Sequence, residues 1–197
     1  GELYDANNDV ALIAERNACK VLCQKYNTMP YEAVEERRAI LRDIIGKTKG
    51  DFVIEPSFWC DYGCNISLGG NFYANHNLVI LDAAPVVFGD NVFVAPNCCF
   101  TTAGHPIDVE QRNKGLEYAR PITVGNNVWI GAGVTVLPGV TIGDNTVIGA
   151  GSVVTKDIPA NVVAVGNPCR VMREIGEKDR KYYFRDNEID WDNIPEE

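Results

Sequence analysis

Aliphatic residues recur at every sixth position between residues 124 and 154. A period of six fits neither an α-helix, whose period is 3.6, nor an alternating strand, whose period is two. Repeats of this kind are typical of a parallel β-helix, in which three six-residue units close one coil. We therefore predict that residues 18 apart stack and form a continuous core. The repeated residues are Val124, Ile130, Val136, Ile142, Ile148 and Val154.

The fourth residue of each unit supports this prediction because it is always Gly or Asn. These residues enter the left-handed backbone region at the lowest cost, so each unit reads as a short strand followed by a corner with positive φ. A β-sandwich with Gly-rich turns is the alternative, and six aliphatic positions in register argue against it. The corner residues are Asn127, Gly133, Gly139, Asn145 and Gly151.

The same period is less regular between residues 51 and 100. One frame contains Tyr62, Leu68, Ala74, Ile80 and Val86, with Asn65, Asn71 and Asn77 at the corners. The frame then shifts by two residues to Phe88, Val94 and Phe100, and we predict a bulge near Ala84 and Pro85 as the cause. After Phe100 the pattern stops until Val124. Residues 101–121 are therefore expected to leave the solenoid as a long loop, and such loops often serve function.

The first 50 residues have a helical pattern instead. Residues 8–26 and 31–45 predict two amphipathic helices, the first capped by Asn8 or Asp9 and the second ended by Gly46. Two short helices cannot form a core alone, so we expect them to cover the open end of the solenoid. The predicted organisation is a helical segment (residues 1–50), a β-helix (51–175) and a charged tail (176–197) with a short helix and an acidic end.

Composition limits the partners and the location. A net charge of −9 over 197 residues argues against nucleic acid, which requires a basic surface. No apolar run reaches membrane-spanning length, and the chain does not open with a signal-peptide pattern. The seven cysteines form no C-x-x-C pair and no recognisable zinc spacing. We therefore expect reduced thiols and a cytoplasmic location.

The candidates for chemistry are few. His105 lies between Gly104 and Pro106 in the predicted loop, where an imidazole could act as a general base, although an exposed histidine without a role is the alternative. His76 is expected to face outward from a strand. Two histidines are too few for the three-histidine zinc site of a β-helix carbonic anhydrase. Lys156, Arg170 and Arg173 are a local basic set that could hold phosphates, or ordinary solvated charges.

Six short motifs are distributed along the chain. They are 3–5 (LYD), 71–75 (NFYAN), 104–108 (GHPID), 121–131 (PITVGNNVWIG), 153–159 (VVTKDIP) and 166–170 (GNPCR). Together they resemble those of the maltose and galactoside O-acetyltransferases among the hexapeptide-repeat acyltransferases, and the resemblance covers essentially the whole chain. The hexapeptide repeat is shared by many acyltransferases, whereas the helical segment together with the His-Pro loop is more specific.

The resemblance implies a left-handed β-helix, assembled as a homotrimer with active sites between subunits, that transfers acetyl from acetyl-CoA to a sugar hydroxyl without a metal. His105 would be the general base and Asn75 would stabilise the tetrahedral intermediate. The acceptor site would be lined by Asp5, Asp61, Tyr73 and Asn75. The acetyl-CoA groove would be lined by Trp129, Ala132, Ala150, Thr155, Lys156, Arg170 and Arg173.

This chain departs from the galactoside branch at three positions. Asp61 and Ala132 stand where that branch has Ser, and Ala83 stands where it has Asp. Asp82 is adjacent to Ala83 but is expected to point to the other face. Preference for galactosides is therefore doubtful, and maltose or glucose is the other sugar class. Two further alternatives remain, namely a non-sugar acceptor such as an amino acid or an antibiotic, and a non-catalytic β-solenoid scaffold.

Overall fold

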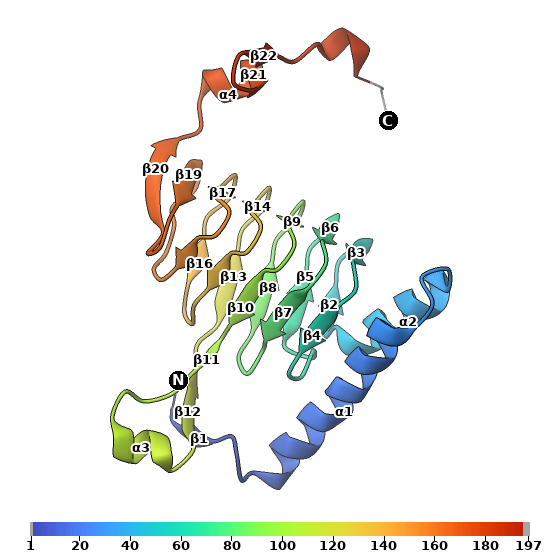
Figure 1. Cartoon of the computed structure of the whole chain (residues 1–197), viewed down its shortest axis with the longest axis vertical. Helices are drawn as coiled ribbons and strands as arrows, with labels where there is room; N and C mark the ends of the chain where they lie inside the picture. Colours follow the sequence, from blue (N-terminus) through green and yellow to red (C-terminus); the bar gives the residue numbers. More distant parts are fainter. Residues whose placement is uncertain (1, 195–197) are drawn as a thin grey trace.

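The computed structural model describes residues 2–194, and the central part of the chain forms a solenoid of stacked coils whose three faces are β-sheets (Figure 1). The first sheet consists of β2 (Lys47–Thr48), β5 (Ile66–Leu68), β8 (Val86–Phe88), β13 (Ile122–Val124) and β16 (Thr141–Ile142). The second consists of β4 (Phe58–Cys60), β7 (Leu78–Leu81), β10 (Cys99–Thr101), β15 (Thr135–Val136) and β18 (Val153–Val154). The third consists of β3 (Phe52–Ile54), β6 (Phe72–Ala74), β9 (Phe93–Val94), β14 (Trp129–Ile130), β17 (Val147–Ile148), β19 (Val162–Val165) and β20 (Arg170–Glu174).

The predicted stacking is confirmed in the C-terminal half of the solenoid. The pairs Val124–Ile142, Ile130–Ile148 and Val136–Val154 lie opposite each other on parallel strands. All six side chains are at most 1% exposed. Each contributes roughly 1.5–3 kcal/mol by burial, so every coil depends on its neighbours for its core.

The N-terminal coils are longer than predicted. Ile54, Ala74 and Val94 pair in succession, so these coils take 20 residues instead of 18. The inward positions are Cys60 and Leu68, and the prediction of Tyr62 was wrong because the two extra residues lie just after Cys60.

Where the chain passes from the second sheet to the first, the corners are irregular. Gly63 has positive φ there, and the prediction of Asn65 was wrong; the Asn65 side chain donates to the Asp82 carbonyl instead. The next coil also has two extra residues at this corner, where the bulge near Ala84 was predicted. Residues 101–121 leave the solenoid at the same corner. We call residues 61–65, 81–85 and 101–121 the irregular corner.

Asparagine side chains stack along the other two corners. Asn71, Asn91 and Asn127 have positive φ, and each Nδ2 donates to the Oδ1 of the next at 2.9 and 3.1 Å. Asn77 donates to Asn97 in the same way at 3.0 Å. These ladders satisfy polar groups that the left-handed corners expose, so a corner Asn fixes both the local turn and the distance to the next coil.

The two predicted helices are present as α1 (Val10–Thr28) and α2 (Val34–Ile44), which cover the first coil (Figure 1). The Asp9 carboxylate accepts from the amides of Ala11 and Leu12, which confirms it as the cap. Gly46 does not end α2, which is already followed by extended backbone at Ile45. Gly46 is instead needed because a Cβ there would lie 2.1 Å from the Cys64 carbonyl oxygen.

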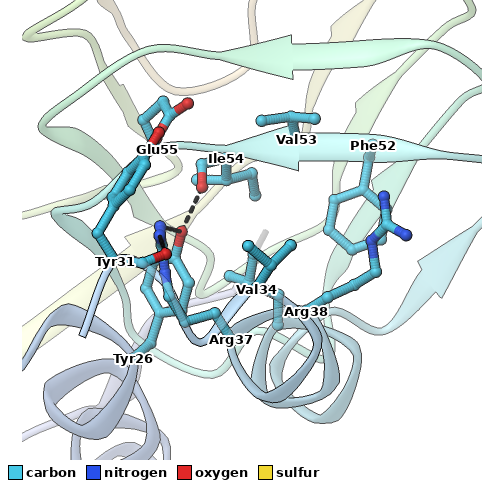
Figure 2. Close-up of a pocket in the computed structure, with 10 residues that line it drawn as sticks. Tyr26, Tyr31, Val34, Arg37, Arg38, Phe52, Val53, Ile54 and Glu55 are labelled. Atoms are coloured by element: carbon cyan, nitrogen blue, oxygen red, sulfur yellow. Dashed lines mark hydrogen bonds between the residues drawn. The ribbon is translucent and has the colours of Figure 1, made fainter. Parts of the chain in front are cut away.

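Arg37 attaches α2 to the solenoid (Figure 2). Its guanidinium carbon lies 4.7 Å from the Tyr31 ring centroid and 5.2 Å from that of Tyr26. Arg37 donates to the Tyr26 hydroxyl, which in turn donates to the Ile54 carbonyl on β3. The adjacent hollow of about 150 Å³ is lined by none of the predicted site residues. The hydrogen bonds of Arg37 and Tyr26 therefore hold the helices against the first coil.

The predicted loop of residues 101–121 has structure of its own. It contains β11 (Ala103–Gly104), α3 (Val109–Asn113) and β12 (Leu116–Ala119). β12 pairs antiparallel with β11 and also with β1 (Tyr4–Asp5), so the start of the chain joins the loop (Figure 1).

After β20, which runs antiparallel to β19, the tail leaves the solenoid (Figure 1). The predicted helix is α4 (Glu177–Lys181). It is followed by a hairpin of β21 (Tyr182–Phe184) and β22 (Asn187–Glu188) and by the 3-10 turn η1 (Trp191–Asn193), while residues 195–197 of the predicted acidic end lie outside the described residues. No helix between residues 2 and 194 has the length and apolar character required to cross a bilayer.

Candidate active site

His105 follows β11 at the start of the loop. Gly104 lets β11 lie close to the Tyr118 side chain on β12, because a Cβ there would lie 2.5 Å from the Tyr118 hydroxyl. Nδ1 of His105 lies 3.0 Å from the Leu116 carbonyl oxygen. A carbonyl can only accept, so Nδ1 carries the proton and Nε2 has the free lone pair. The side chain is 47% exposed, which leaves Nε2 accessible as a base.

Glu117 lies next to this basic nitrogen. Its Oε1 is 3.7 Å from His105 Nε2, and its Oε2 accepts a 3.0 Å hydrogen bond from the Tyr4 hydroxyl on β1. Burial and, after it, the Glu117 carboxylate raise the pKa of Tyr4, so the phenol stays protonated and donates. A proton accepted at Nε2 would be stabilised by the nearby carboxylate. Neither Tyr4 nor Glu117 was predicted as a site residue, because the two pair across strands 113 residues apart in sequence.

A hollow of about 380 Å³ lies beside this group, lined by Tyr4, Tyr62, Asn65 and Ala83 among others. Arg16 borders it, donating to the Tyr62 hydroxyl at 3.0 Å and to the Ala6 carbonyl at 2.6 Å. Phenols, an amide and small apolar side chains therefore line this space, and Tyr4 links it to His105 through Glu117. Such a mixture of aromatic and polar groups suits a ligand with several hydroxyls.

Two of the predicted acceptor residues lie near this hollow in different settings. Asp5 is exposed and accepts from the Asn8 side chain and from the amides of Asn7 and Asn8. The Asn8 side-chain hydrogen bond is the main cause that lowers the pKa of Asp5. Asp61 is half-buried, and burial raises its pKa, although Lys20 acts in the opposite direction. Asp5 therefore closes the turn before α1, whereas Asp61 is a carboxylate whose charge is poorly solvated.

Asp82 and Ala83 point in opposite directions, as predicted. Asp82 is fully buried, and its Oδ1 accepts from the amides of Asp61 and Tyr62 at 3.0 and 2.9 Å. Burial raises its pKa, and its Oδ2 has no partner among residues 2–194. Ala83 lines the hollow instead. Asp82 thus shapes the corner, and Ala83 is the one of the two that a ligand could contact.

The other predicted catalytic residue lies elsewhere. Tyr73, Asn75 and Trp129 line a second hollow of about 390 Å³ on the third sheet, together with Phe93. Asn75 Oδ1 accepts from the His76 amide at 2.7 Å, so its amide nitrogen remains as a donor. Within residues 2–194 no hydrogen bond joins Asn75 to His105. One chain therefore does not bring the predicted catalytic pair together.

The residues predicted for the donor groove lie on the last coils. Ala132 and Ala150 are on successive coils, where the Gly151 amide donates to the Ala132 carbonyl, and Thr155 and Lys156 are exposed nearby in sequence. Arg170 is exposed on β20. Arg173 makes a bidentate ion pair with Asp179 at 2.6 and 2.7 Å. This pair lowers the pKa of Asp179 to about 2, so Arg173 is already engaged by the tail.

Comparison with known proteins covers both parts of the chain. Residues 1–50 match the family model described as the maltose acetyltransferase hexapeptide capping motif, and residues 121–156 match the bacterial transferase hexapeptide with six repeats. The galactoside O-acetyltransferase of Escherichia coli is 50% identical over 171 residues, which cover 87% of this chain and 84% of that protein. This chain belongs to the maltose and galactoside O-acetyltransferase family of hexapeptide-repeat acyltransferases.

Further relatives agree with this membership. A putative acetyltransferase of Saccharomyces cerevisiae is 59% identical over 179 residues, which cover 91% of each chain. A galactoside acetyltransferase solved in complex with coenzyme A superposes with a TM-score of 0.93 at 47% identity, covering 96% of this acetyltransferase and 94% of that chain. A maltose O-acetyltransferase of Clostridium difficile superposes with a TM-score of 0.87 at 52% identity, covering 90% and 94%. The predicted family, the acetyltransferase class and the left-handed β-helix fold are confirmed.

Proposed function

We propose that this acetyltransferase moves the acetyl group of acetyl-CoA to a hydroxyl of a mono- or disaccharide, with His105 as the general base. The observation that carries the proposal is the hydrogen bond between Nδ1 and the Leu116 carbonyl, which leaves Nε2 as a base that Glu117 and Tyr4 link to the hollow. The relatives named for galactoside and maltose O-acetylation support the sugar class, and the solved complex with coenzyme A supports the donor.

The proton path follows from the position of Nε2. His105 takes the proton of the acceptor hydroxyl as its oxygen attacks the thioester carbonyl carbon. The C–S bond then breaks, and the imidazolium returns the proton to the leaving thiolate. Glu117 lies 3.7 Å from Nε2 and would stabilise the imidazolium between these two steps.

The negative oxygen of the tetrahedral intermediate needs a donor, and Asn75 is our candidate. Since Asn75 and His105 lie at separate places of one chain, we infer a homotrimer in which His105 of one subunit faces the hollow of Asn75 on the next. The third sheet supports such an assembly, because large apolar side chains are exposed along it. These are Val53 (44%), Phe93 (45%) and Trp129 (56%).

The residues present fit an acetyl-CoA groove. Gly131 has no room for a side chain, since a Cβ would lie 2.6 Å from the Ala150 amide nitrogen. Ala132 and Ala150 have small side chains that do not project far from the surface. Pantetheine could lie along such a surface, with Trp129 at one side. The exposed cations Lys156 and Arg170 would meet the phosphates. We propose no role for a metal in this reaction.

The acceptor hollow favours a sugar without galactoside preference. Ala83 leaves room where the galactoside branch has Asp, and Asp61 places a half-buried carboxylate where that branch has Ser. We therefore expect glucose or maltose to be better acceptors than galactosides.

The test is CoA release from acetyl-CoA with glucose, maltose, a galactoside, serine and chloramphenicol as acceptors. Removing a general base costs about 10²–10⁴ in rate, so His105→Ala should lose kcat with a sugar by this factor. His76→Ala is the matched control, because the hydrogen bond of its ring within residues 2–194 goes to the Pro56 carbonyl and not to a proposed site residue, so the variant should keep its activity. Product analysis should avoid thiol reagents, since the seven cysteines would react with them.

Each alternative has its own outcome. Turnover only with serine or chloramphenicol would replace the sugar by a non-sugar acceptor. An unchanged rate in His105→Ala would remove the histidine from the mechanism. Failure to bind CoA in calorimetry would favour the scaffold, and a monomer in light scattering would contradict the shared site.

A further inference from the structure

Three of the seven cysteines meet at the junction between the helical cap and the solenoid. Cys19 and Cys23 lie one turn apart on α1, and Cys60 points inward from β4 in the first coil. Their sulfur atoms all lie within 4.8 Å of one another. The Sγ–Sγ distances are 3.5 Å for Cys19–Cys60 and 3.8 Å for Cys23–Cys60. All three thiols are free and at most 5% exposed.

A buried cysteine is usually a small hydrophobic side chain, and that explanation suffices for Cys98 and Cys169. The group at α1 differs because each sulfur has another sulfur as its polar neighbour. The three sulfur atoms therefore form one cluster, in which each side chain could contribute a thiolate to the same cation.

The spacing matches that of thiolates around one soft ion. Thiolates bind zinc at about 2.3 Å, so two of them in a tetrahedral site are about 3.8 Å apart. Soft sulfur ligands select Cu⁺ and Zn²⁺ over Mg²⁺ or Ca²⁺. Cys19 also lines a hollow of about 270 Å³ together with Asp43, Tyr62 and Cys64, which offers a route from the surface and room for a solvent ligand.

We propose that Cys19, Cys23 and Cys60 bind one soft, thiophilic cation, Zn²⁺ or Cu⁺, which joins α1 to the first coil of the solenoid. The thiols release their protons to solvent as the metal–sulfur bonds form, so binding weakens as the pH falls. The three ligands are not among the residues assigned to acetyl transfer, although Tyr62 lines both the hollow beside Cys19 and the acceptor hollow. The bound cation stabilises the cap. Its ligands come from two elements 37–41 residues apart, which is why sequence spacing gave no sign of it.

The test uses reduced, metal-free full-length protein titrated with Cd²⁺, while the sulfur-to-cadmium charge-transfer absorbance is followed. We expect saturation at one ion per chain. Since even outer-sphere changes weaken metal sites about 10–100-fold, Cys19→Ala, Cys23→Ala and Cys60→Ala should each weaken binding at least tenfold. Competition with Zn²⁺ and with chelator-buffered Cu⁺ then ranks the two ions. Cys98→Ala and Cys169→Ala are the matched controls, as both replace buried cysteines elsewhere and should bind Cd²⁺ like the wild type.

A second measurement does not depend on how the variants fold. Zn²⁺ or Cu⁺ should raise the Tm of the wild type and slow amide exchange in α1. The proposal is overturned if the wild type takes up no Cd²⁺, if the triple variant at Cys19, Cys23 and Cys60 keeps the absorbance, or if Cys98→Ala weakens binding equally. A Cys19–Cys60 disulfide in protein purified without reductant, with no metal uptake after reduction, would replace it by a redox pair.

Discussion

The three corners of the solenoid follow two different plans. Two corners keep a constant six-residue unit and are lined by Asn or Gly with positive φ, including the ladder from Asn71 to Asn127. The irregular corner gains two residues in each of two coils, and the next coil, which contains the loop, has 36 residues where a regular coil has 18. The polar groups around His105 border it, and Ala83 and Asp82 belong to it. The regular corners set the spacing of coils, and the irregular corner uses that spacing to align residues distant in sequence.

The largest effect should come from damaging a regular coil. Ile148→Ala removes a fully buried side chain, so the free energy of unfolding should fall by about 2–5 kcal/mol in chemical denaturation. The ratio of kcat/KM between acceptors should stay constant for the folded protein. An altered acceptor ratio would show that the regular coils also shape the acceptor site.

A change in the irregular corner should alter the preference between acceptors and leave the free energy of unfolding nearly constant. Ala83→Asp places a carboxylate in the hollow beside Tyr4 and Tyr62, so kcat/KM for galactosides relative to glucose should rise roughly tenfold. Ala84→Asp, which adds the same charge outside this hollow, is the control. Equal ratios in both variants would mean that the hollow does not hold the acceptor.

Asp82 should make stability depend on pH through the irregular corner. Burial raises its folded pKa above the unfolded value of about 3.9, so the folded chain binds more protons in this range. The wild type should therefore lose free energy of unfolding as pH rises from about 4 through the raised folded pKa, relative to Asp82→Asn. Denaturation at pH 4, 5.5 and 7 measures the free energy of unfolding of Asp82→Asn minus that of the wild type. This value should increase with pH, and a decrease would contradict the assigned burial.

The smallest effect is expected at the tail, outside both kinds of corner. Asp179→Asn frees Arg173 from its ion pair, so KM for acetyl-CoA should fall about twofold if Arg173 meets a phosphate. Asp186→Asn changes the same charge further along the tail and is the control. A KM that does not change in Asp179→Asn would take Arg173 out of the donor groove.

The regular coils could be predicted from the sequence because each residue repeats the environment of the residue 18 positions away. Val124 and Ile142 reveal their contact through period alone. The irregular corner gives no such signal, so the inward position was assigned to Tyr62 instead of Cys60. The pairing of Tyr4 with Glu117 joins a two-residue strand to a distant loop, and so short a strand has no detectable pattern.

The asparagine ladders have a consequence for how this architecture can change length. At each ladder the backbone of one coil lies directly over that of the previous coil, whether the coil contains 18, 20 or 36 residues. New sequence can therefore enter at one edge without shifting the coils above or below it. Loops of different size could therefore be exchanged at this edge to build new acceptor sites while the coils keep their spacing.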